Sequence, residues 1–238
     1  MRRVSGAVGA VLQMASVAAA QTSPVAHFSP TAVSAYADSF VTLIRGVPQG
    51  WHRYSLEKTS DDLRFTDAFA LGANLRRTVV VTLTPRLTVT TVRSTGREFG
   101  QAVAVQLDYV GQRARGWAVM RGESQPRRVA IDTVLPEGGF DGNALMAFLP
   151  LLDWRVGATY RLTLFDTDEG SITTQMLRIA SRDTVTVPAG TFEAYRADLS
   201  TTQAPVRLWY TTAEPHRLIK MGDPTDTFVT LLVGKTAH

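Results

Sequence analysis

Residues that could bind a metal ion or transfer a proton are few and far apart along the chain. The histidines are His27, His52, His216 and His238. No two of them have the i, i+2 or i, i+4 spacing of a local metal site, so we predict no metal. His216 lies between Pro215 and Arg217 at the start of an expected strand. Its ring could hydrogen-bond within a turn, which we favour, or bind a ligand or transfer a proton.

The acidic residues and the missing cysteines point to no known chemistry. Asp166, Asp168 and Glu169 before Gly170 resemble a fragment of a calcium loop, but the other oxygen ligands and the distant glutamate are missing. A hairpin turn with solvated acids explains them better. The chain contains no cysteine, which excludes disulfides, thiolate sites and a thiol nucleophile. It has no G-x-S-x-G elbow and no phosphate loop, so we predict no cofactor and find no catalytic motif.

The aromatic residue with the clearest functional reading is Trp209. In the expected strand 205–211, Val206, Leu208 and Tyr210 point to one face, while Arg207 and Trp209 point to the other. If the first face is the core, Trp209 could line a concave ligand surface or contact a partner. A second core layer covering Trp209 is the alternative.

Two helical segments are expected to cover the sheet. Ser29 and Pro30 resemble a helix start, and the apolar residues from Val33 to Ile44 follow with helical spacing, so we predict a helix over 30–45. Leu145, Phe148, Leu149 and Leu152 also have helical spacing, interrupted by Pro150, which predicts a short helix and a turn over 143–152. Loose packing of these segments would leave a cavity for an apolar ligand, whereas tight packing would make an ordinary core.

The rest of the chain shows the two-residue alternation of strands. Val103, Val105, Leu107 and Tyr109 alternate with polar or small residues. Further strands are expected near 63–69, 78–84, 87–93, 159–166, 172–180, 183–187, 191–200, 205–211, 217–221 and 227–233. The short spacing without intervening helices predicts a mainly β fold with a single curved antiparallel sheet, or an open or half barrel. The loop 136–143 could divide it into two subdomains.

The N-terminus has the features of a secretory signal peptide. Arg2 and Arg3 precede a short apolar run, and Ala18 to Ala20 precede a cleavage site before Gln21. We therefore expect a signal peptide over 1–20, a flexible leader over 21–29 and an exported β-rich domain over 30–238. The protein would be periplasmic if its source has an outer membrane and extracellular otherwise.

Charge and hydropathy limit the classes of partner that the protein is expected to bind. The signal would remove two arginines and no acid, which leaves the mature chain close to neutral. Its Lys and Arg residues are scattered along the sequence, which argues against nucleic-acid binding. The apolar run is too short for a permanent membrane span, and without cysteine there is no lipid anchor.

A family resemblance appears near the C-terminus. The motifs are VPAGTF-x-AYR within 187–196, WY at 209–210 and PHRLIK at 215–220. Pro188 presets a turn, and Gly190 can adopt the positive φ that closes a hairpin. In order and spacing these motifs resemble an exported bacterial β-rich family of unknown function. More distantly, the chain is similar to the half-barrels of periplasmic lipoprotein carriers. The family has no agreed catalytic residues, so the resemblance implies none here.

Together these features favour a non-catalytic exported protein. It would bind an apolar or amphipathic ligand, or an envelope protein, against the concave face of the sheet. The residues expected to contribute are Trp209, Arg207, His216, Tyr36, Phe40 and Phe148. Two alternatives stay open: a structural envelope protein that recruits a partner without a small-molecule site, and a hydrolase whose acids are brought together by the fold.

Overall fold

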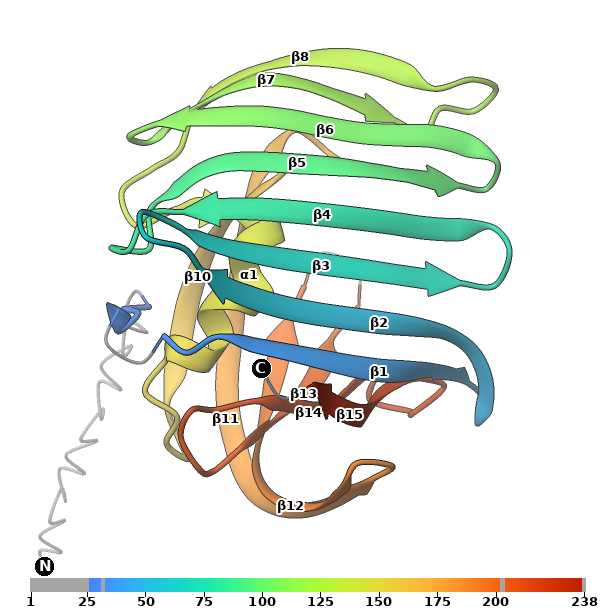
Figure 1. The fold of residues 1–238 in the computed structure, drawn as a ribbon, viewed down its shortest axis with the longest axis vertical. Helices are drawn as coiled ribbons and strands as arrows, with labels where there is room; N and C mark the ends of the chain where they lie inside the picture. The colour runs from blue at the N-terminus through green and yellow to red at the C-terminus, as the bar shows by residue number, and fades with distance from the viewer. Residues whose placement is uncertain (1–25, 31–32, 202–203, 237–238) are drawn as a thin grey trace, which may run out of the picture.

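The computed structural model describes residues 26–30, 33–201 and 204–236, and these form one 15-stranded sheet (Figure 1). The predicted signal peptide 1–20 lies outside the described residues. The first half of the sheet contains β1 (Tyr36–Ile44), β2 (Val47–Lys58), β3 (Leu63–Leu71), β4 (Leu75–Leu83), β5 (Val89–Glu98), β6 (Gln101–Val110), β7 (Arg113–Met120) and β8 (Arg127–Val134). The second half contains β9 (Phe140–Asp141), β10 (Thr159–Asp166), β11 (Ser171–Val187), β12 (Gly190–Ser200), β13 (Val206–Thr211), β14 (Leu218–Gly222) and β15 (Phe228–Thr236).

The first strand, β1, lies in the middle of the sheet. Its strands follow the order β8 to β1 and then β15 back to β9, so β1 pairs with β15 and the two halves are continuous. All neighbouring strands are antiparallel except β9 and β10. The edge strands β8 and β9 are joined by the loop 135–139, which spans at most about 20 Å. The sheet must therefore curve until its two edges come close, without closing into a barrel.

The predicted helix over 30–45 is wrong, because residues 36–44 form β1. Tyr36, Phe40 and Ile44 are spaced by four residues, and an even spacing also places them on one face of a strand. Asp38 and Thr42, which the helix would have exposed, lie on the same inner face and are buried. Both find partners in the second half of the chain, Arg217 and Thr230. Long-range pairing therefore decides the conformation of this segment.

The short helical segment predicted over 143–152 is present. It consists of η2 (Gly142–Ala144), α1 (Leu145–Phe148) and η3 (Leu149–Leu151). The Asp141 carboxylate accepts a hydrogen bond from the Asn143 backbone N–H at 2.8 Å, which caps the first turn. Figure 1 shows α1 behind the strands of the first half, inside the curve of the sheet. Phe148 and Leu149 are buried there in the core.

The C-terminal strands largely follow the sequence pattern. The predicted strand over 159–166 matches β10, and the turn between β11 and β12 falls at Pro188, where Gly190 has φ +128°. The segments predicted separately over 172–180 and 183–187 form one long strand, β11, with a bulge between Ile179 and Ser181. Among the described residues, no helix has the length and hydrophobicity needed to cross a membrane.

Candidate functional site

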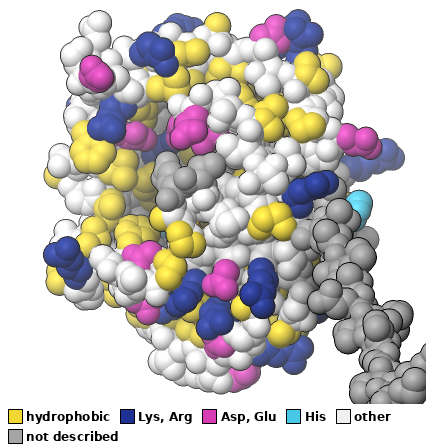
Figure 2. Space-filling view, turned by 180° about the vertical axis from the view of Figure 1, so that it is seen from behind, with side chains coloured by type: hydrophobic (Ala, Val, Ile, Leu, Met, Phe, Trp, Pro, Cys, Tyr) yellow, Lys and Arg dark blue, Asp and Glu magenta, His cyan; other side chains and the backbone are white. Residues whose placement is uncertain are grey.

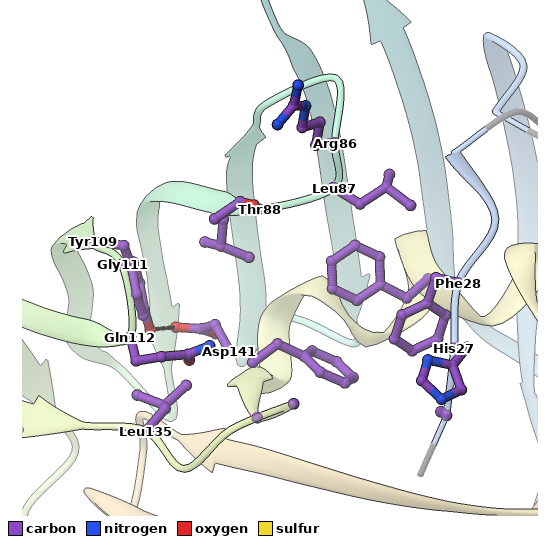
Figure 3. Close-up of a pocket in the computed structure, with 16 residues that line it drawn as sticks. His27, Phe28, Arg86, Leu87, Thr88, Tyr109, Gly111, Gln112, Leu135 and Asp141 are labelled. Carbon is purple, nitrogen blue, oxygen red and sulfur yellow. Dashed lines mark hydrogen bonds between the residues drawn. The ribbon is translucent and has the colours of Figure 1, made fainter.

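A pocket of about 270 Å³ opens at one rim of the curved sheet (Figure 3). Four segments surround it: residues 26–28, the β4–β5 turn at 86–89, the β6–β7 turn at 109–112 and the segment 135–141, with Phe148 of α1 beneath them. The turns lie together because the sheet is an antiparallel meander, in which alternate turns gather at the same end of the strands. The volume is near the lower limit of about 300 Å³ that is usual for small-molecule sites.

The floor of the pocket is a cluster of three phenylalanines. The rings of Phe28 and Phe148 stack with centroids 4.8 Å apart. The Phe140 ring meets both of them edge to face, at 5.6 Å from Phe28 and 4.8 Å from Phe148. Phe28 belongs to the predicted leader, whose residues 26–29 contact the domain through backbone hydrogen bonds from Ala26 to Arg161 and from Ser29 to Leu151. This floor offers an apolar surface to a ligand.

The polar end of the pocket is a fully buried carboxylate, Asp141. It accepts hydrogen bonds from the Tyr109 hydroxyl at 2.5 Å, and from the backbone N–H and side-chain amide of Asn143, both at 2.8 Å. Burial raises the pKa of Asp141, although these three donors act in the opposite direction. Burial also raises the pKa of Tyr109, and the charge of Asp141 adds to that shift. Tyr109 therefore stays a protonated donor at neutral pH.

Two exposed side chains, the guanidinium of Arg86 and the imidazole of His27, lie at the rim of the pocket. Figure 3 shows Arg86 and His27 at different parts of the pocket wall, both away from Asp141. Leu87 and Leu135 add apolar surface between the floor and the rim. The pocket thus combines an aromatic floor, one buried carboxylate whose oxygens are already hydrogen-bonded, and a guanidinium at its edge.

Of the residues expected to form the site, only Phe148 lines this pocket. Tyr36, Phe40 and His216 lie together around a separate internal cavity of about 10 Å³, which has room for a single water molecule. Little open space is therefore left between these three residues and the helical segment. The His216 ring also lines a wider depression of about 720 Å³ on the other side of residues 27–28.

Arg207 lines none of these three hollows, and Trp209 lines a different depression of about 450 Å³ together with Lys220 and Leu231. In β13, Leu208, Trp209 and Tyr210 are all buried and belong to the core, so burial does not alternate along this strand. The Trp209 indole donates to Asp183 at 3.1 Å and lies under the Lys220 ammonium, 4.6 Å from the ring centroid, so it is covered by neighbouring polar side chains. Arg207 donates to the carbonyl of Pro224 at 3.2 Å. His216 Nδ1 lies 2.8 Å from the carbonyl of Thr211, within its own turn.

Sequence reasoning missed Phe28, Tyr109 and Asp141. The spacing of Asp141 and Asn143 is that of a capping turn, which could have identified Asp141 as an ordered residue. Within the described part of the chain, no group of three His, Cys, Asp or Glu side chains is placed to hold a metal ion.

Comparisons with known proteins found one family and several solved structures that are similar to this chain. A β-barrel-like protein of the domain of unknown function DUF1849 from Brucella abortus superposes with a TM-score of 0.50 at 7% identity, covering 91% of this chain and all of that one. A candidate lipoprotein of Parabacteroides distasonis superposes with a TM-score of 0.31 at 12% identity, covering 90% of this chain and all of that one. No curated protein matches the chain. Residues 46–232 match a family described as a protein of unknown function, DUF3108. The chain therefore belongs to the DUF3108 family, and the family resemblance expected from its C-terminal motifs extends over most of its length.

Proposed function

We propose that this protein is an exported, non-catalytic binder of a small amphipathic molecule, and that the ligand occupies the pocket above Phe28, Phe140 and Phe148. The observation that carries the proposal is the aromatic floor, in which the half-buried Phe28 ring stacks on the buried Phe148 and lines a pocket that opens to solvent. An apolar group stacked on this floor would lose water-accessible surface, which favours binding. Arg86 at the rim would attract an anionic headgroup.

Binding is favoured over catalysis by the surroundings of Asp141. A carboxylate that acts as a base or nucleophile needs a free oxygen directed at the substrate. The two oxygens of Asp141 already accept from Tyr109 and twice from Asn143, which holds the loop in place. Export is supported by the signal-like sequence of residues 1–20.

A fluorescence titration tests this proposal. The probe is 1-anilinonaphthalene-8-sulfonate, which combines apolar rings with an anionic group. We expect saturable binding by the wild-type protein and about tenfold weaker binding by Phe28→Ser, because one face of the aromatic floor is lost. Phe99→Ser is the matched control, since Phe99 is exposed at a distant turn. Native mass spectrometry of the purified protein would then identify any co-purifying molecule.

Equal probe affinity in the wild type and in Phe28→Ser would overturn the proposal. The same conclusion would follow if Phe99→Ser weakened binding as much as Phe28→Ser does. In either case the pocket would not be the binding site.

A further inference from the structure

The outer face of the first half of the sheet carries arginines at one end of its strands. The register pairs Arg76 with Arg97 across β4 and β5, and pairs Val119 with Arg128 across β7 and β8. We define the arginine–aromatic face by the exposed arginines and the rings beside them: Arg53, Arg76, Arg97, Arg121 and Arg128 with Trp51, Phe99 and Trp117. It lies on the right of Figure 1, where the β3–β4, β5–β6 and β7–β8 turns gather.

Three of these guanidinium groups lie over aromatic rings. The distance from the guanidinium carbon to the ring centroid is 4.3 Å for Arg128 over Trp117 and 4.9 Å for Arg121 over Phe99. Cation–π contact holds the guanidinium group against the ring and leaves its N–H donors directed to solvent. A third pair, Arg76 over Trp51, has a distance of 5.9 Å.

The arginines of this face have no acidic partner. Among the described residues, none of the five forms an ion pair with a carboxylate, whereas Arg113 further along the same outer face binds Asp132 at 2.7 Å. The carboxylate of Glu98 is directed to the buried Arg77 at 3.7 Å, and only the exposed Glu123 follows on the β7–β8 turn. Direct pairing of Arg76 with Arg97 is unfavourable for an isolated sheet. An anion between them would remove this repulsion.

The opposite side of the molecule shows a different charge pattern. In Figure 2 the acidic and basic side chains of that side lie among one another. The arginine–aromatic face instead carries five exposed arginines, none of which is ion-paired with a carboxylate of the described residues.

The shape of the face identifies the partner. It is convex and extends from β2 to β8, which is about 29 Å at the usual strand spacing. A convex surface encloses neither a peptide nor a single small anion, but the end of the strands where the β3–β4, β5–β6 and β7–β8 turns gather can approach a planar surface. Exposed apolar side chains are found at the same end: Phe99 is 64% exposed, Val47 54% and Trp51 41%. Arginines with aromatic and aliphatic side chains at one level are suited to the headgroup region of a membrane.

We propose that the arginine–aromatic face docks this protein onto an anionic phospholipid surface. Lipid phosphates bind Arg76, Arg97 and their neighbours, and Phe99 enters the headgroup layer. The docking uses none of the pocket residues, so it is independent of the proposed ligand.

Vesicle sedimentation tests the docking. The full chain is mixed with vesicles of phosphatidylcholine alone, or of phosphatidylcholine with phosphatidylglycerol, at several salt concentrations. We expect binding to the anionic vesicles only, weakening as salt rises. The double variant Arg76→Gln/Arg97→Gln should partition about 25-fold less, roughly fivefold for each arginine removed.

The matched control is Arg113→Gln/Arg115→Gln, which removes the same charge from arginines beside Asp132 at the other end of the strands. We expect it to bind vesicles nearly as well as the wild type. Phe99→Ser should weaken binding without changing its salt dependence, and Phe28→Ser should leave it unchanged. Far-ultraviolet circular dichroism confirms that each variant is folded.

Three results would overturn the proposal: no binding of the wild type to anionic vesicles, equal binding to neutral vesicles, or equal losses in the two double variants. If the wild type ignores vesicles but cross-links in cells to an acidic protein through this face, the partner is a protein instead of lipid.

Discussion

The strands β1–β8 and the elements β9–β15 share one sheet, but the ion pairs on the outer face of the first region differ from the contacts of Asp38 and Asp141 that join it to the second; inside the first region, His52 with Asp67 and Arg77 with Ser94 are also shielded from solvent. Within the first region, the ion pair of Arg113 with Asp132 is exposed, with about half of each side chain in solvent. Between the regions, Asp38 of β1 accepts two hydrogen bonds from Arg217 with only 3% of its side chain exposed. The contact between Tyr109 and Asp141 also joins the two regions and is largely buried.

This difference indicates how each region is stabilised. The hairpins of β1–β8 bury one face and expose the other, so backbone pairing and apolar packing stabilise them and surface ion pairs add little. Where the second region meets the first, polar groups are removed from water and depend on one another. Single polar substitutions should therefore have their largest effects where the two regions meet.

The largest effect is expected for Asp38→Ala. This substitution removes the carboxylate that pairs with the Arg217 guanidinium. The Arg217 side chain is 82% shielded from solvent, and its guanidinium carbon lies 4.5 Å from the centroid of the Tyr36 ring. We expect a loss of about 3 kcal/mol in the free energy of unfolding, the lower end for a broken buried pair because Arg217 is 18% exposed. Urea denaturation measures it.

The control for this experiment is Asp132→Ala, which removes the exposed partner of Arg113. Its unfolding midpoint should stay at the wild-type value, because solvent takes over the contacts of an exposed guanidinium. Equal losses in the two variants would contradict the distinction between buried and exposed pairs.

A smaller effect separates two tyrosine hydroxyl groups, one in each region. Tyr109→Phe removes a donor to the fully buried Asp141, and we expect it to cost about 1 to 2 kcal/mol. The hydroxyl of Tyr210 is buried and has no hydrogen-bond partner among the described residues. Tyr210→Phe should therefore leave stability unchanged or raise it by up to about 1 kcal/mol. Thermal unfolding of both variants measures the contrast, and a large loss in Tyr210→Phe would indicate a bound water.

The sequence predicts an element correctly when local contacts determine its conformation, and fails when contacts with a distant part of the chain determine it. The bounds of β10 and the turn at Pro188 follow from local alternation and turn chemistry, which the sequence displays directly. Residues 36–44 were assigned to a helix because a four-residue spacing fits both helix and strand. Pairing of β1 with β15, nearly 190 residues later along the chain, resolves that ambiguity, and no local pattern contains it.

The pocket was even less accessible to sequence reasoning. Phe148 was identified because helical spacing places it on the covered face of a short helix. Phe28, Tyr109 and Asp141 come from three distant segments, and only the curvature of the sheet brings them to one rim. Trp209 is buried, and its contacts with Asp183 and Lys220 depend on two other strands, which no local pattern contains.

The smallest effect is a difference in pH dependence between a buried and an exposed aspartate. Burial raises the pKa of Asp141 above 3.8, so between pH 3.8 and that raised pKa the folded protein binds more protons than the unfolded chain. The contribution of Asp141 to stability therefore falls as pH rises through this window. Asp223 in the β14–β15 turn accepts from Thr225 and the backbone of Phe228, which lower its pKa to about 2. Its contribution is present above pH 3.8 and is lost as pH falls toward 2.

The two variants should therefore change opposite sides of the stability profile. Asp141→Asn, in which the Tyr109 hydroxyl can turn to accept from the new amide, should remove the decline that begins above pH 3.8. Asp223→Asn should instead flatten the profile below pH 3.8. Melting temperatures measured from about pH 2 to about pH 7 distinguish them. If Asp141→Asn instead changed the profile only below pH 3.8, Asp141 would behave as a solvated carboxylate. The contact of Asp141 that joins the two regions would then be no more buried than the ion pairs on the surface.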